Sequence, residues 1–392
     1  MKHEKRYRNT GKVTNRFKKF RIAPYLEILL GLGLLAALGW AVYTYAVPFF
    51  GNLYTHAYSC AKATATPSPS PVPTPEPTRD PYPDHALYNA DLKTMQEEIV
   101  VPEYQYTADV SIYRDTILAA AGNYTPDGTA AFVRALLYNV NTQKYTLLAL
   151  PLQYKSIRFP AMNGRWIVYL DSAANGGGRM MAYDRTTKKA KELKTVHTGL
   201  PRPMVYGDTA IWLERTGQSR DKLFAVDLKT GESATLVIYD NSLYALSDPF
   251  LFENILLYVS PDGALTKLDL KTGESETVPV SVGYVHDPQM NRDGIAYLDS
   301  DHAADGSLWF DDGSTITEVV KGAADFAMGD GFIAYSRHEK NYVYYYADGT
   351  TFCTTRSDET AMLLTAGEKL LVWMDVTWRD KDIMEYMTVG DE

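Results

Sequence analysis

Apolar residues in the C-terminal three-quarters of the chain fall into short runs separated by turn-forming pairs, a pattern that favours β-strands. One run contains an aromatic residue near its end and occurs at Trp166–Leu170, Ala210–Leu213, Ile255–Val259, Ile295–Leu298, Phe332–Ser336 and Leu370–Met374. Its aromatic residues are spaced by 43, 46, 39, 38 and 38 positions. A short turn such as Asn163-Gly164 or Asp293-Gly294 precedes each run, as in a β-hairpin.

An internal repeat gives these runs their context. The heptapeptide Asp227–Ser233 (DLKTGES) recurs without change at Asp269–Ser275, 42 residues later. A period near 40 residues is the length of one four-stranded blade of a β-propeller. We therefore predict an all-β propeller over residues 96–392, in which the regularly spaced aromatic residues form the core between blades.

The number of copies predicts the number of blades. Seven strand pairs follow Gln105 if Thr116–Ala120, which lacks the aromatic residue, is the first, and each blade then has about 41 residues. Because that first copy is degenerate, six blades remain an alternative. The last copy ends with Ile383–Met387 and leaves no room for a fourth strand. Glu98–Pro102 precedes the first blade and is predicted to supply that strand, which closes the ring and hides its edges.

These motifs resemble those of the TolB-like β-propeller superfamily. The resemblance rests on the repeated Asp/Asn-Gly, Ile-x-Tyr and Asp-Leu-x-Thr-Gly-Glu elements over residues 97–392, and on one Ser-Pro-Asp-Gly element at Ser260–Gly263. It implies the propeller architecture. It implies no activity, because the shared residues form turns and packing contacts.

The N-terminal part has a different composition. Residues Ile28–Phe50 carry no charge, and 23 residues are long enough for a helix that crosses a membrane. Nine Lys or Arg residues and one acid precede this segment within residues 1–22, which places the N-terminus in the cytoplasm by the positive-inside rule. We predict a basic cytoplasmic tail (1–22), a single transmembrane helix (23–50) and an extracytoplasmic propeller.

A stalk is predicted between the helix and the propeller, over residues 51–95. Eight of the twenty residues from Thr64 to Pro83 are proline, and such a run favours an extended polyproline II conformation. The predicted role is a spacer that lifts the propeller from the bilayer.

Charge and cysteine content exclude several classes of function. The chain beyond residue 22 has 30 basic and 47 acidic residues, which argues against a nucleic acid partner. Only Cys60 and Cys353 are present, so no disulfide framework is expected. No cofactor is predicted, since none of the histidines has the spacing of a metal site.

Candidate binding residues lie in the loops between the second and third strands and between blades, because variable loops on a rigid scaffold commonly carry function. These loops share one face, and the tight turns share the other. The candidates are Asp171, Arg179, Glu214, Arg220, His286, Asp299, His302, Arg337, Trp378 and Arg379. Asp299, Asp301 and Asp305 have the acidic alternation of a calcium loop, although two extra residues break the usual ligand spacing.

Three functions are compatible with this layout. The first is a membrane-anchored recognition module that binds an extracytoplasmic protein or a cell-wall component. The second is a scaffold subunit of an envelope complex. The third is a propeller enzyme that acts on glycan or peptide, for which His286 and His302 are the catalytic candidates. The predicted function is the first, and the chain is not expected to be an enzyme.

Overall fold

The computed structural model of the chain describes residues 96–125, 130–174, 176–215, 220–240, 247–280, 282–300, 306–355, 359–377 and 381–390. The predicted tail, transmembrane helix and stalk (1–95) lie outside the described residues. Among the described residues, no helix has the length and apolar character needed to cross a membrane.

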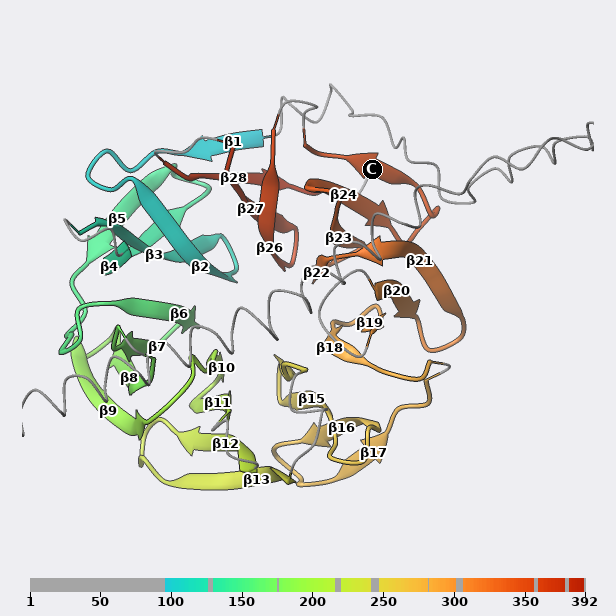
Figure 1. Ribbon diagram of the computed structural model, residues 1–392, viewed down its shortest axis with the longest axis horizontal. Helices are drawn as coiled ribbons and strands as arrows, with labels where there is room; N and C mark the ends of the chain where they lie inside the picture. Colours follow the sequence, from blue (N-terminus) through green and yellow to red (C-terminus); the bar gives the residue numbers. More distant parts are fainter. Residues whose placement is uncertain are drawn as a thin grey trace, which may run out of the picture. The chain divides into compact units, whose positions relative to one another are not determined.

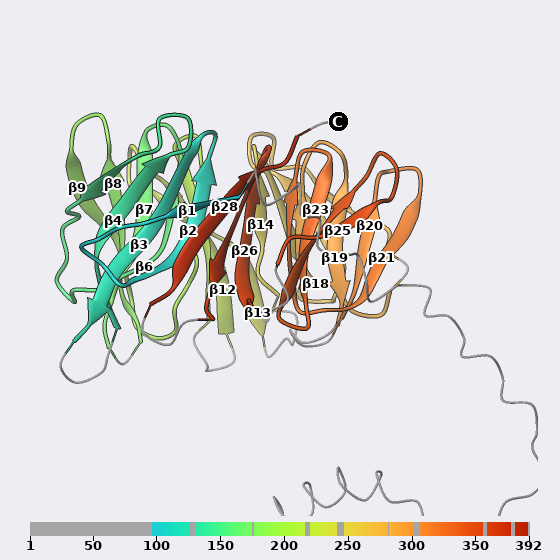
Figure 2. The same ribbon diagram turned by 90° about the horizontal axis from the view of Figure 1, so that it is seen from above.

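Seven four-stranded antiparallel sheets are arranged around one axis, so the prediction of a seven-bladed propeller is confirmed (Figures 1 and 2). From the axis outwards, the first blade consists of β2 (Tyr106–Tyr113), β3 (Thr116–Tyr124), β4 (Ala130–Asn139) and β5 (Lys144–Leu148), and the second of β6 (Ile157–Met162), β7 (Trp166–Ser172), β8 (Gly178–Asp184) and β9 (Lys189–Val196). The third blade consists of β10 (Met204–Tyr206), β11 (Thr209–Glu214), β12 (Arg220–Asp227) and β13 (Ser233–Asp240). The fourth blade consists of β14 (Phe250–Phe252), β15 (Ile255–Val259), β16 (Leu265–Asp269) and β17 (Ser275–Thr277).

The remaining three blades follow the same order. Their strands are β18 (His286–Met290), β19 (Ile295–Asp299), β20 (Gly306–Asp311) and β21 (Ile316–Ala323); β22 (Asp325–Gly329), β23 (Phe332–Arg337), β24 (Lys340–Tyr345) and β25 (Thr351–Cys353); and β26 (Ala361–Gly367), β27 (Leu370–Asp375), β28 (Ile383–Thr388) and β1 (Gln96–Ile99).

The ring is closed by a strand from the N-terminal end, as the sequence predicts. Strand β1 pairs antiparallel with β28, so that Gln96 lies opposite Met387 and Ile99 lies opposite Met384. Ile99 is buried among apolar residues of the first and last blades. The two blades that meet at the ring closure therefore share one core.

Apolar side chains fill the spaces between neighbouring blades. The aromatic residues predicted to form this core lie on the second strand of each blade, and Tyr169, Trp212, Tyr297, Tyr335 and Trp373 are all 5% exposed or less. Tyr258 is half-buried. The spacing of the aromatic residues thus reflects one core position that recurs in six blades.

The repeated Asp-Leu-Lys-Thr-Gly-Glu segment forms the turn between the third and fourth strands. Asp227 Oδ1 accepts hydrogen bonds from the backbone N–H groups of Lys229 (2.7 Å) and Thr230 (2.8 Å). Gly231 has φ = 81°, a conformation that favours glycine. Asp269 and Gly273 repeat this arrangement in the next blade. These residues maintain the turn, and the strand order places it at the end of the axis opposite the loops between blades.

Candidate functional site: a charged cavity on the propeller axis

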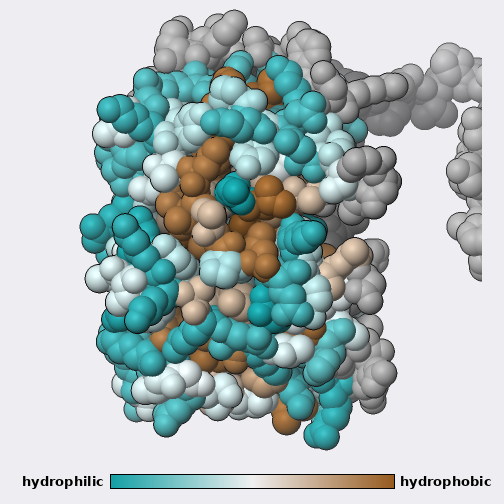
Figure 3. All heavy atoms as spheres, turned by 90° about the vertical axis from the view of Figure 1, so that its left-hand side faces the viewer, coloured by the Kyte–Doolittle hydropathy of each residue, from teal (hydrophilic) through white to brown (hydrophobic). Residues whose placement is uncertain are grey.

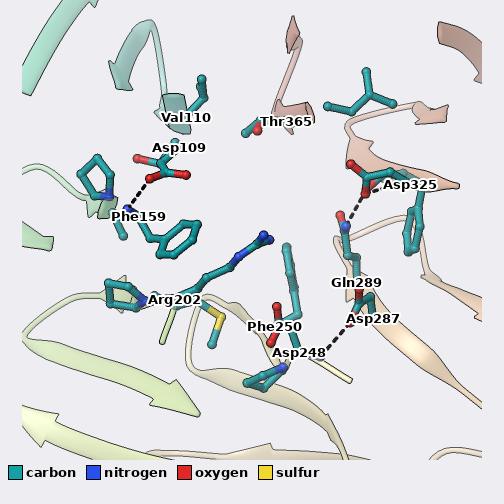
Figure 4. A pocket seen from close by; sticks show the side chains of 18 of the residues that line it. Asp109, Val110, Phe159, Arg202, Asp248, Phe250, Asp287, Gln289, Asp325 and Thr365 are labelled. Atoms are coloured by element: carbon teal, nitrogen blue, oxygen red, sulfur yellow. Dashed lines mark hydrogen bonds between the residues drawn. The ribbon is translucent and has the colours of Figure 1, made fainter. Parts of the chain in front are cut away.

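A cavity of about 300 Å³ lies on the axis and is lined by the innermost strands of all seven blades (Figure 4). Six of its residues come one from each of the first six blades, and we call them the axial ring: Asp109, Phe159, Arg202, Asp248, Asp287 and Asp325. Leu364 and Thr365 on β26 line the cavity from the seventh blade. The ring lies near the N-terminal ends of the inner strands, on the face that carries the loops between blades.

The inner strands turn several of these side chains towards the axis by means of β-bulges. In the first blade the register between β2 and β3 shifts between Ala108 and Ser111, beside Asp109. Similar shifts occur beside Phe159 and Asp287. At these bulges φ is 55° for Asp109, 46° for Phe159 and 44° for Asp287. Positive φ is uncommon for residues other than glycine, and bulges re-aim side chains.

Proline occupies the next position in four consecutive blades. The pairs are Phe159-Pro160, Arg202-Pro203, Asp248-Pro249 and Asp287-Pro288. Proline has no N–H to donate and is therefore confined to sheet edges and bulges. Pro160 and Pro288 lie on inner strands, which are sheet edges that face the axis, and Pro203 and Pro249 directly precede the inner strands of their blades, so proline is tolerated at this position.

The axial ring has a sequence signal that our sequence analysis missed. Each ring residue precedes a core position of the second strand by ten positions: Asp109 and Ala119, Phe159 and Tyr169, Arg202 and Trp212, Asp248 and Tyr258, Asp287 and Tyr297, Asp325 and Tyr335. The spacing used to count blades thus also selects the axial residues, since the same hairpin recurs in each blade.

Two acids of the ring are paired with arginines. Asp109 Oδ2 lies 2.6 Å from Arg158 Nε and accepts a hydrogen bond from the backbone N–H of Phe159 at 3.0 Å. Asp248 Oδ1 lies 2.6 Å from Arg215 Nη2. The charges of these two carboxylates are therefore largely compensated by the scaffold.

A reciprocal backbone contact joins the fourth and fifth blades. The N–H of Asp248 donates to Asp287 Oδ1 at 2.7 Å, and the N–H of Asp287 donates to Ser247 Oγ at 3.0 Å. The other oxygen of Asp287 lies 3.2 Å from His286 Nδ1. Burial opposes protonation of His286, but the nearby carboxylates, chiefly Asp287, outweigh it and raise the pKa of His286.

Asp325 and Arg202 differ from the other charged ring residues. Among the described residues, neither has an oppositely charged side chain within ion-pair distance. Asp325 accepts a hydrogen bond from the N–H of Phe326 at 2.8 Å. Asp325 is exposed to the open cavity, but the surrounding walls replace part of the bulk water around its carboxylate, and this effect, with the charge of Asp287, raises the pKa of Asp325 to about 6. Arg202 stacks over the ring of Phe159 at 4.8 Å, and its guanidinium points into the cavity (Figure 4).

The predicted binding residues that the structure describes lie around the cavity rather than on its wall. Asp171 is fully buried and bonds Arg179 at 2.6 Å, while Glu214 is buried and bonds Lys194 at 2.6 Å. Arg220 is exposed and pairs with Asp240 at 2.8 Å. His286 is 5% exposed.

Other predicted residues divide into two groups. Asp299 and Arg337 end the second strands β19 and β23 and do not line the cavity. Asp301, His302, Asp305, Trp378 and Arg379 lie outside the described residues. The predicted calcium loop and the three predicted ligand-binding residues His302, Trp378 and Arg379 therefore remain predictions.

A second group of carboxylates lies in the last blade. Ligand oxygens of Glu359, Asp375 and Glu385 all lie within 4.8 Å of one another, a spacing compatible with a divalent cation. Protein groups already bond two of them: Trp373 Nε1 donates to Glu385 at 2.6 Å, and the N–H of Thr377 donates to Asp375 at 2.9 Å. Burial, then the charge of Glu359, raises the pKa of Glu385 to about 7.

Comparisons with known proteins place the fold. No protein-family model and no curated protein sequence matches the chain. Among solved structures, the chain is similar to the β-propeller domain of the Trilobed protease from Pyrococcus furiosus, with 12% identity and a TM-score of 0.54 over 74% of this chain and 97% of that chain. That propeller is described as having an open velcro topology, whereas here β1 pairs with β28.

Two further structures are similar at the same level. The acylaminoacyl peptidase of Pyrococcus horikoshii has 12% identity and a TM-score of 0.52, and the match covers 73% of this chain and 52% of that chain. An oligogalacturonate lyase in complex with manganese has 13% identity and a TM-score of 0.52, over 76% of this chain and 93% of that chain. At these identities the likeness concerns the fold alone, and it identifies residues 96–390 as a β-propeller.

Proposed function

We propose that this chain is a recognition module whose propeller binds an extracytoplasmic ligand in the axial cavity. The observation that carries the proposal is the axial ring, in which each charged side chain comes from a different blade, on its inner strand or just before it, and all line one cavity. Residues held on rigid strands keep their positions without a ligand, and such preorganisation favours binding. Membership of the TolB-like superfamily, suggested by the sequence motifs, is part of the same proposal.

The N-terminal segment adds a location to the proposal. The basic tail and the uncharged segment that follows it support a single membrane anchor with the propeller outside the cytoplasm. The proline-rich stalk would hold the propeller away from the bilayer. In this arrangement the ligand is an extracytoplasmic protein segment or a component of the cell wall.

Site-specific photo-crosslinking in cells tests the choice of site. A photoreactive phenylalanine analogue replaces Phe250, which lines the cavity from β14. The matched control carries the analogue at Phe252, two residues further along the same strand and outside the cavity lining. We expect a discrete mass adduct at position 250 and none at position 252. Equal adducts at both positions, or none at 250, would contradict the axial site.

One surface feature favours the second candidate function, a scaffold subunit. Apolar side chains gather on the side of the propeller formed by the first blades (Figure 3). Half-buried Leu148, Leu152 and Ala190 pack in the seam between the first and second blades, and Tyr154 nearby is 42% exposed. Contiguous apolar surface of this kind marks protein interaction sites when it is large.

A substitution on that side separates the two functions. Tyr154→Lys places a charge beside the apolar seam between the first and second blades and leaves the axial ring unchanged. A scaffold would lose its membrane partners in co-purification with this variant, whereas a module that binds at the axis would retain the adduct at position 250. Chemical conversion of the captured ligand would instead support the propeller enzyme.

A further inference from the structure

The charge balance of the axial cavity indicates the class of ligand. Arg158 compensates Asp109, and Arg215 compensates Asp248. The ring charges that no arginine compensates by direct contact are therefore Arg202, Asp287 and Asp325, and of these Asp287 contacts His286 Nδ1 at 3.2 Å. A ligand that enters this cavity meets one cation and a pair of carboxylates.

Arg202 is placed to receive a carboxylate. Its side chain is exposed to the cavity, and its guanidinium extends towards the cavity centre (Figure 4). The aromatic face of Phe159 supports the guanidinium at 4.8 Å and leaves its N–H donors available to the cavity. The planar fork of arginine matches the two oxygens of a carboxylate, with two parallel hydrogen bonds.

Asp325 and Asp287 are placed to receive an ammonium group. They belong to adjacent blades on the other side of the cavity from Arg202 (Figure 4). The charges of Asp287 and Arg202 both affect the pKa of Asp325, so the three side chains lie near one another. Asp325 nevertheless forms no ion pair with Arg202. A cation between the two carboxylates would relieve their mutual repulsion.

Apolar side chains line part of the same cavity. They include Met204, Phe250, Phe326 and Leu364. The volume of about 300 Å³ is at the lower end of the range of ligand pockets, which is roughly 300–1,000 Å³. The cavity therefore suits a small molecule with a short hydrocarbon part and a charge of each sign.

We propose that the axial cavity binds a small zwitterion, a free α-amino acid or a peptide of two or three residues, with its carboxylate on Arg202 and its ammonium group between Asp287 and Asp325. This inference deepens the proposed function and rests on it. A dianion such as inorganic phosphate is disfavoured because it would face two carboxylates. A divalent cation is disfavoured because it would face the guanidinium of Arg202.

Calorimetric titration of the purified full-length protein tests the ligand class. The probes are the common α-amino acids and their dipeptides and, for each probe that binds, its N-acetylated acid and its carboxamide. The first derivative lacks the ammonium group and the second lacks the carboxylate. We expect at least one zwitterion to bind, and either derivative to bind roughly ten- to a hundredfold more weakly, the range for hydrogen bonds to charged groups.

Two variants assign each charge to its residue. Arg202→Gln should weaken the zwitterion and remove its advantage over the carboxamide, while its advantage over the N-acetylated acid persists. Asp325→Asn should also weaken the zwitterion, but it should remove the advantage over the N-acetylated acid and leave the advantage over the carboxamide. Arg292→Gln, in an exposed ion pair with Glu253, is the matched control and should leave affinity unchanged. Circular dichroism and thermal unfolding verify that each variant is folded.

The outcomes separate the ligand class from the site. If no zwitterion binds, or if inorganic phosphate, calcium or manganese binds in its place, the proposed class of ligand is wrong. The axial site then still stands if crosslinking at position 250 captures a ligand in cells. If both experiments give nothing, the axial site is wrong as well. If Arg202→Gln lowered the affinities for the zwitterion, its N-acetylated acid and its carboxamide equally, Arg202 would not be the residue that binds the ligand carboxylate.

Discussion

Glu98 of β1 lies directly opposite Glu385 of β28 in the strand pair that closes the propeller. Like charges on opposite residues destabilise a strand pair. Glu385 is 7% exposed, and Glu359, Asp375 and Glu98 all add to the effect of burial in raising its pKa. Closure of the ring therefore introduces electrostatic repulsion into the last blade.

This repulsion predicts a stabilising substitution, Glu385→Gln. The pKa of Glu385 rises from 4.5 to about 7 on folding, so the stability associated with its neutral form is present below the unfolded pKa and lost as pH rises through about 7. We expect the variant to match the wild type near pH 4 and to exceed it above about pH 8, by on the order of 2–3 kcal/mol. Urea unfolding at both pH values, with a chelator present to exclude metal binding, measures the difference.

The control for this prediction is Glu98→Gln. Glu98 is exposed and contributes the smallest of the effects that raise the pKa of Glu385, so its removal should act in the same direction but less strongly. If Glu385→Gln raised the free energy of unfolding equally at acidic and alkaline pH, the gain would not come from the ionisation of Glu385, because an effect of packing does not depend on the protonation of this residue.

Closure by β1 predicts unequal effects at two neighbouring residues. Ile99 is 5% exposed in the core between the first and last blades, whereas Val100 is 64% exposed. Ile99→Ala should lower the free energy of unfolding by about 2–5 kcal/mol, because it removes buried methyl groups and leaves a cavity. Val100→Ala should change it by less than about 0.5 kcal/mol. Chemical denaturation measures both, and similar losses would show that β1 does not seal the core.

Asp171 is predicted to be essential for stability whether or not it also binds a ligand. It is fully buried and accepts hydrogen bonds from the N–H groups of Gln153 and Tyr154 and from Arg179. Asp171→Ala leaves these donors unpaired, and a loss of about 3–5 kcal/mol is expected. The exposed pair Arg220 and Asp240 supplies the comparison, since Asp240→Ala should cost less than about 1 kcal/mol. Equal losses in urea unfolding would contradict this role.

The electrostatics of the cavity can be read from the titration of Asp325. Its pKa is raised to about 6 by loss of hydration and by Asp287, whereas the N–H of Phe326 and Arg202 act against the rise. Asp287→Asn should therefore lower the pKa of Asp325, and Arg202→Gln should raise it further. Carbon-13 carboxyl NMR of labelled aspartate follows the titration. A pKa that is the same in both variants would show that these side chains do not share one cavity.

Much of the fold follows from the sequence because a propeller is built from local hairpins. Turn residues such as Asp227 and Gly231 act within a few positions, and the aromatic residues recur at the period of one blade. The closing strand was predictable too, since the last repeat lacks a fourth strand. These features depend on spacing along the chain.

The site was less accessible to the same reasoning. Sequence analysis placed the candidates in the loops that are richest in charge, yet Asp171 and Glu214 are buried there in ion pairs with Arg179 and Lys194. The axial ring was overlooked, although Arg202-Pro203 and Asp287-Pro288 stand at the blade period. A charged residue beside a proline indicates a strand edge or a turn, and the pattern does not show what that edge faces.

The blade repeat, its turns and the strand that closes the ring could be predicted from the sequence, because each depends on short-range geometry or on a count of strands. Which charges meet depends on the folded arrangement of the blades. Arg202 and Asp325 are 123 residues apart in the chain, and they share a cavity because seven blades bring their inner strands to one axis. Whether a charge is compensated or left available to a ligand depends on neighbours in space, and these come from other blades.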